Sequence, residues 1–173
     1  MLLIGGETVR LGLETGIEAL DAVQVVSDQH LSIPEQLIFW DAFSLIADHA
    51  KKHQFPSHVA QSSLRCHILV LHSEKAALMF ATGELGSFAP IIFLPMSRIL
   101  SRKREAAAAF HRAVLLEELC HYLYEIWDEY EVKELVADIL RRKYPTLRLH
   151  QIHPDWFDEN DARIPGMPNP YGS

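Results

Sequence analysis

The segment from Ser97 to Trp127 limits the possible folds of this chain more than any other, because it contains neither glycine nor proline. It is rich in alanine and other good helix formers, which predicts a long helix from about Lys103 to Trp127. The pattern then predicts a break near Trp127 to Glu129 and a second helix from about Tyr130 to Lys143, which Pro145 ends. Because the link is short, we expect the two helices to pack antiparallel.

The remaining pattern mixes strands with helices. "RCHILVLHS", "ALMFATG" and "APIIFLP" are short apolar runs that predict a small sheet, with the last run leading into the long helix. "SIPEQLIFWDAFSLIADHAKKHQF" predicts an amphipathic helix capped at Ser32, and a further helix is expected around Ile17 to Val26. The expected fold class is therefore α+β, a small mixed β-sheet packed against helices.

Length and composition indicate one domain. The chain has 173 residues, of which 49% are hydrophobic and 23% charged, and no linker divides it, so residues 1–150 are expected to form a single domain. Residues 151–173 hold four prolines and no periodicity, which indicates a Pro-rich C-terminal tail.

The start lacks a signal-peptide pattern and no apolar run could cross a bilayer, so we expect a cytoplasmic protein with no membrane contact. Cys66 and Cys120 lie in apolar segments without CxxC spacing and are expected to be buried free thiols.

The net charge of −7 comes from one segment. Between Glu117 and Asp138 the chain has eight acids and one base, Lys133, whereas acids and bases balance over the rest of the sequence. Crowded carboxylates repel one another unless they are solvated, paired or bridged by a cation. This segment is therefore either a solvated helix face or a cation site. The basic clusters elsewhere are too small to indicate nucleic-acid binding.

Two residues of this segment lie on one helix face. Glu117 and His121 are four residues apart and project side by side, while Glu118 stands at the edge of the same face. This is the geometry of the zincin helix, in which the outer residues of H-E-x-x-H hold zinc and the inner Glu activates a water. Here the stretch reads Glu117-Glu118-Leu119-Cys120-His121. The alternative is an ordinary histidine on a half-exposed helix face.

"LLEELCHYL" followed by "EVKELVADILRRKYP" resembles the two active-site helices of zincin-like metallopeptidases, the gluzincin and ImmA/IrrE-type branches in particular. The resemblance covers about residues 66 to 145. It implies a zincin-like fold with a long active-site-type helix, His121 as a histidine ligand and Glu118 as general base. Zinc is the implied cofactor, although another divalent metal, or none, is compatible with this set of residues.

The resemblance also implies a glutamate ligand on the second helix, where two residues compete. Glu134, followed by Asp138, has the gluzincin spacing, and its distance along the chain allows a return to the level of His121. Alignment with the ImmA/IrrE-type helix favours Glu131 instead. The expected metal ligands are therefore Glu117, His121 and Glu134, with Glu131 as the rival, and His150 and His153 are possible additional ligands.

Glu117 stands where the family has a histidine, and this substitution alters the expected chemistry. A site with two carboxylates and one imidazole would make zinc a weaker Lewis acid than a two-histidine site does. The expected function is a metallopeptidase-like protein with weak or lost hydrolysis. The alternative is a non-catalytic interaction module on a zincin-like scaffold, with a peptide or protein partner bound by the acidic cleft or the tail.

Overall fold

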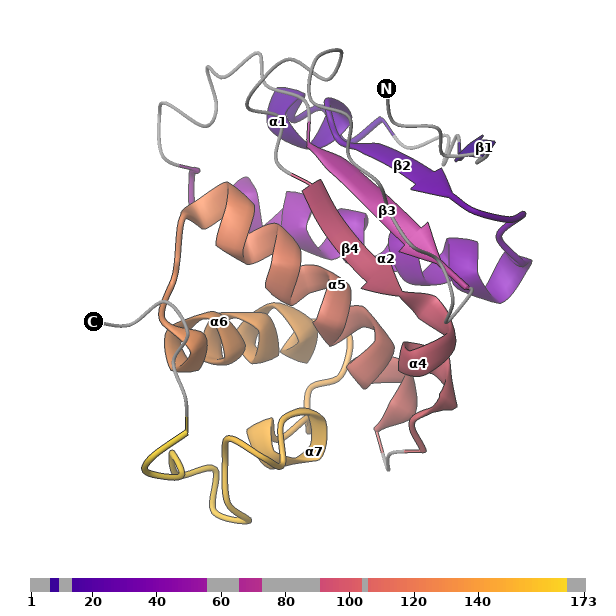
Figure 1. The fold of residues 1–173 in the computed structure, drawn as a ribbon. Helices are drawn as coiled ribbons and strands as arrows, with labels where there is room; N and C mark the ends of the chain where they lie inside the picture. Colours follow the sequence, from indigo (N-terminus) through magenta and orange to yellow (C-terminus); the bar gives the residue numbers. More distant parts are fainter. Residues whose placement is uncertain (1–6, 10–13, 56–65, 73–90, 104–105, 168–173) are drawn as a thin grey trace.

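The computed structural model describes residues 7–9, 14–55, 66–72, 91–103 and 106–167, and the fold mixes helices with one β-sheet (Figure 1). The elements are, in chain order, β1 (Glu7–Val9), α1 (Glu18–Asp21), β2 (Gln24–Ser27), α2 (Ile33–Ala50), β3 (His67–Leu71), β4 (Ile91–Pro95), α4 (Met96–Ser101), α5 (Ala107–Tyr124), α6 (Glu129–Arg141) and α7 (Leu149–Ile152).

The sheet has four strands in the order β1-β2-β3-β4 and is mixed, as the sequence predicts. β1 pairs with β2 antiparallel, whereas β2, β3 and β4 are parallel. Strands β2 and β3 are joined through α2, the crossover that a parallel pair needs. Ile68, Leu69 and Val70 of β3 are all buried, as expected for a central strand covered on both faces. The predicted strand "ALMFATG" lies outside the described residues.

The predicted helix around Ile17 to Val26 is confirmed only in its first part. Only Glu18–Asp21 is helical, and Gln24–Ser27 forms β2. Val25 and Val26 are β-branched and pair with Ile68 and Leu69 of β3, so strand pairing outweighs the weak local helix signal.

The predicted helical hairpin is confirmed, with different boundaries. Strand β4 leads directly into a helix, as expected, but this helix is the short α4, and Arg102 is extended before α5 begins at Ala107. Glu125 adopts a left-handed conformation (φ 55°) and ends α5 at Tyr124, three residues earlier than predicted. Asp128 caps α6 by accepting hydrogen bonds from the backbone N–H groups of Tyr130 and Glu131, both at 3.0 Å.

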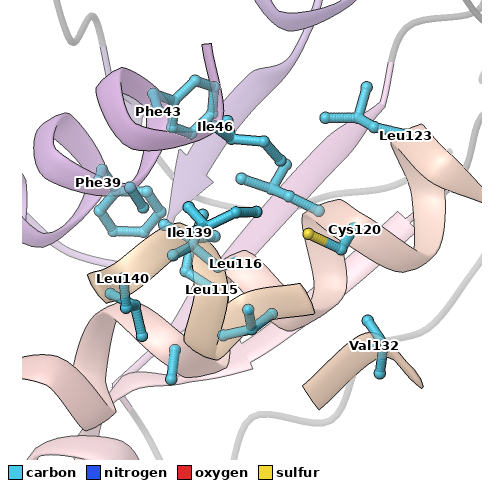
Figure 2. Close-up of a cluster of buried hydrophobic side chains, with 14 of the residues drawn as sticks. Phe39, Phe43, Ile46, Leu115, Leu116, Cys120, Leu123, Val132, Ile139 and Leu140 are labelled. Atoms are coloured by element: carbon cyan, nitrogen blue, oxygen red, sulfur yellow. The ribbon is translucent and has the colours of Figure 1, made fainter. Parts of the chain in front are cut away.

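Helices α2, α5 and α6 share one core with side chains of strands β2 and β3. Helices α6 and α7 lie on the side of α5 that faces away from the sheet (Figure 1). The predicted helix α2 begins with the expected cap at Ser32, whose backbone N–H donates to Glu35 Oε2 at 2.7 Å. Figure 2 shows how side chains of the three helices meet. Those labelled are Phe39, Phe43 and Ile46 of α2, Leu115, Leu116, Cys120 and Leu123 of α5, and Val132, Ile139 and Leu140 of α6.

The segment after α6 packs on the domain. Ile152 and Phe157 are buried in the same core as the helices. The Tyr130 hydroxyl donates to the carbonyl of Ile164, and the Arg163 guanidinium pairs with Glu134 at 2.7 Å. Residues 151–167, which composition alone separates as a tail, therefore pack against the domain around α6 and contribute to its core. None of the described helices combines the length and the apolar character that a membrane span requires.

Candidate metal centre

The hairpin of α5 and α6 brings three potential metal ligands together. Glu117 and His121 lie one turn apart on α5, and Glu129 is the first residue of α6. One ligand atom from each residue lies within 4.8 Å of those from the other two, so this cluster could hold a metal ion. The predicted pairing of Glu117 with His121 on one face is thus found, together with a carboxylate from the second helix.

Lys133 places its own positive charge in this cluster. The side chain is buried, and its ammonium donates a hydrogen bond of 2.7 Å to Glu117 Oε1 and another to Glu129 Oε2. The ammonium also lies 4.2 Å from the centre of the Trp156 ring, a cation–π contact. Lys133 is therefore the counter-ion that bridges the two carboxylates.

His121 is oriented by a backbone carbonyl. Its Nδ1 lies 2.5 Å from the carbonyl oxygen of Ile126. Because a carbonyl only accepts, Nδ1 carries a hydrogen and donates it, which directs Nε2 to within 3.7 Å of Glu129 Oε1. The ring also stacks on Trp127. Metal-binding histidines commonly use this arrangement, in which one nitrogen donates to a carbonyl and the other faces the ion.

Burial makes the carboxyl groups of Glu117 and Glu118 costly to ionise. Burial raises the pKa of Glu117, and Glu129 adds to the increase, although Lys133 opposes it. Burial likewise raises the pKa of Glu118, and the neighbouring charge of Glu117 raises it further. Because each carboxylate disfavours ionisation of the next, an additional cation would stabilise the ionised cluster.

Glu134 and Glu131, the residues predicted as the glutamate ligand, do not join this cluster. Glu134 forms a two-pronged pair with Arg163, at 2.7 and 2.8 Å, and Glu131 is exposed at the start of α6. Glu129 takes the place predicted for the glutamate ligand of the second helix, because α5 ends three residues after His121. The link therefore spans residues 125–128, and the first residue of α6 already lies at the level of His121.

A pocket of about 470 Å³ opens beside the cluster. Glu117, Glu118 and Lys133 line one part of it, and His153 and Trp156 come from the C-terminal segment. His153 is buried, with Nδ1 3.9 Å from Glu117 Oε2, so this possible additional ligand does face the site. His150 is neither in the cluster nor among the described residues that line the pocket. Glu118, the predicted general base, lies on the pocket wall.

Sequence reasoning missed the roles of Glu129, Lys133 and Trp156. One signal was available: Asp128 is a favoured helix N-cap, followed by acids in the first turn, which indicates that α6 begins at Glu129. Glu129 and Lys133 then have the i, i+4 spacing of a helical ion pair. No local signal indicates Trp156, which reaches the cluster from a segment distant in sequence.

The residues fit a metal ion only after a rearrangement. Tetrahedral zinc has ligand bonds of about 2.0–2.1 Å, which place neighbouring ligand atoms about 3.4 Å apart. A separation of up to 4.8 Å therefore requires a small inward movement, and the Lys133 ammonium must leave the carboxylates. The donor set itself, two carboxylates and an imidazole, is chemically suitable for zinc and for harder divalent ions.

The cysteines take no part in this chemistry. Both are free and buried, as predicted. Burial raises the pKa of Cys66 to about 12, so its thiol stays protonated at neutral pH. Burial also raises the pKa of Cys120. This residue precedes His121 in the sequence, but its side chain is buried in the core (Figure 2). Neither thiol has the low pKa that a nucleophilic cysteine needs.

Comparison of the chain with models of protein families, with curated protein sequences and with solved structures gives no match.

Proposed function

We propose that this protein is a zincin-like metallopeptidase relative with an altered metal centre, in which a divalent cation binds in exchange for the Lys133 ammonium. Glu117, His121 and Glu129 would hold the ion. Glu118 would act as the base toward its bound water. The observation that carries the proposal is that these three ligand groups, from both helices of the hairpin, lie within 4.8 Å of one another, and that two of them already bind a buried positive charge, Lys133.

The order of elements also supports the proposal. Strand β4 runs into helices, the ligand-bearing α5 follows, and α6 returns with a carboxylate at the same level. The Nδ1 bond from His121 to a carbonyl holds Nε2 toward the centre. A ligand-bearing helix after a strand and a carboxylate returned by the next helix are what the resemblance to zincin-like metallopeptidases implies, but here the carboxylate is that of Glu129 and Glu117 stands in place of a histidine.

Hydrolysis is expected to be weak or absent. Two anionic ligands lower the Lewis acidity of the ion and raise the pKa of its bound water compared with a two-histidine site. The ion must also displace Lys133, which two carboxylates and the Trp156 ring hold in place. Both effects reduce activity, and the second one lowers metal affinity as well.

A zinc titration of purified protein tests the proposal. Isothermal titration should give weak binding to the wild type, none to His121→Ala, and stronger binding to Lys133→Met, in which the competing ammonium is gone. Lys143→Met is the matched control, because Lys143 pairs with Asp41 away from the site at 2.6 Å and should leave zinc affinity unchanged. Equal affinities for wild type and Lys133→Met would refute exchange at this cluster.

The second candidate is a non-catalytic interaction module on the same scaffold, which the Lys133 geometry also favours. A buried ammonium that bridges Glu117 and Glu129 neutralises them without any metal. Elemental analysis of protein purified without chelator or a nickel column separates the two candidates. Stoichiometric zinc supports the metal centre. Absence of metal, together with no binding to Lys133→Met, supports the interaction module.

A further inference from the structure

We infer that the pocket beside the Lys133 cluster binds a primary alkylammonium group on an unbranched aliphatic stem. The favoured source is a lysine side chain of a peptide, a choice that rests on the proposed function. The pocket volume of about 470 Å³ falls in the usual range for small-ligand sites.

The pocket has an excess of negative charge. Among the described residues, its lining contains the carboxyl groups of Glu117, Glu118, Glu129 and Asp155, against the cationic groups of Arg102 and Lys133. Lys133 already pairs with Glu117 and Glu129. Glu118 has neither an ion pair nor a side-chain hydrogen bond to any residue that the structure describes, so its carboxylate is available to a ligand. A positively charged ligand would complement this field, whereas a carboxylate would be repelled.

The other walls suit an aliphatic stem. Val114 and Phe110 lie one and two turns before Glu118 on the same face of α5, and both line the pocket. Ile152 and Trp156 line it from the C-terminal segment. An acidic group beside apolar walls matches a lysine side chain, whose methylene stem is apolar and whose head is charged.

Lys133 provides an internal example of the same recognition. Its ammonium is held by two carboxylates while the face of Trp156 lies 4.2 Å away. The combination of carboxylate and aromatic ring that binds this internal ammonium is thus already built into the pocket wall. In the metal-free protein, a ligand ammonium would use Glu118 in the equivalent way.

Peptide binding to the full chain in the presence of a chelator tests this inference independently of any metal. The probes are acetylated and amidated pentapeptides with a central lysine, norleucine or glutamate between alanines, and the measurements are isothermal titration and tryptophan fluorescence. The lysine peptide should bind, the norleucine peptide at least tenfold more weakly, and the glutamate peptide not at all. Trp156→Phe should abolish the fluorescence change.

Variants and a free amine complete the test. Glu118→Gln should weaken lysine-peptide binding about tenfold or more, as expected for loss of a charge-assisted hydrogen bond. The control Asp138→Asn removes an exposed acid of α6 and should not change it. Equal binding of lysine and norleucine peptides, no binding of the lysine peptide, or an unchanged affinity of Glu118→Gln would overturn the inference. Tighter binding of 1,5-diaminopentane than of the lysine peptide would support the alkylammonium site but refute a peptide source. Because chelator is present, absence of peptide binding would not bear on the zinc titration. Absence of zinc binding would likewise not bear on the peptide titration.

Discussion

Replacement of Lys133 by methionine should destabilise the folded protein strongly. The substitution keeps a side chain of similar length but leaves Glu117 and Glu129 without the ammonium that bridges them in a buried site. Removal of one partner of a buried ion pair typically costs about 3–5 kcal/mol, because the remaining charge is left uncompensated. For a domain of this size the melting temperature should fall by roughly 6–20 °C. Urea denaturation at neutral pH, in the presence of chelator, measures the loss of unfolding free energy.

Two further variants show whether the uncompensated charge is the cause. Lys133→Met combined with Glu117→Gln should recover part of the lost stability, since one of the two stranded carboxylates becomes neutral. Lys143→Met removes a half-exposed lysine whose partner Asp41 is also held by Arg112, and it should cost less than about 1 kcal/mol. A loss at Lys133 no larger than that at Lys143 would refute a desolvated counter-ion in this cluster.

Three other outcomes follow from the same structure. Burial lowers the pKa of His49 to about 4, so the native state stays neutral while the unfolded chain binds a proton near pH 6.5. The free energy of unfolding should therefore fall between pH 6.5 and 4 by at most about 1.4 kcal/mol per pH unit, and His49→Gln should lose this slope in urea titrations. Burial lowers the pKa of His72, but hydrogen bonds of 2.8 Å to Asp28 and Glu35 outweigh it and raise the pKa overall. This stabilisation is present below about pH 6.5 and is lost as pH rises through the folded-state pKa. His72→Gln should therefore lower the free energy of unfolding more at pH 6 than at pH 9 in urea titrations, and equal losses at the two pH values would contradict this prediction. Glu117→His should tighten zinc binding in isothermal titration, because it adds a neutral imidazole ligand and removes a carboxylate partner of Lys133. A zinc affinity at or below that of the wild type would count against a metal role for this position.

Local pattern was sufficient for the elements that carry the site. The helix after Ser32, strands β3 and β4 and the α5–α6 hairpin were all predicted, since each depends on apolar spacing, capping or chain breakers within a few residues. The shared face of Glu117 and His121 follows in the same way from helix geometry alone. Strand β2 was missed because its short apolar run forms a strand only through pairing with β3, which lies some forty residues later.

The sequence by itself determined that acids would gather around His121 on a helix followed by a second helix. Only the tertiary structure decided which groups meet there. The left-handed turn at Glu125 shortens α5, and this change of a few residues brings Glu129 rather than Glu134 to His121. Packing of the C-terminal segment then adds Trp156 above Lys133. The physical reason is that side-chain contacts across a hairpin depend on the exact residue at which each helix ends, whereas propensities and patterns locate helix ends only to within a few residues.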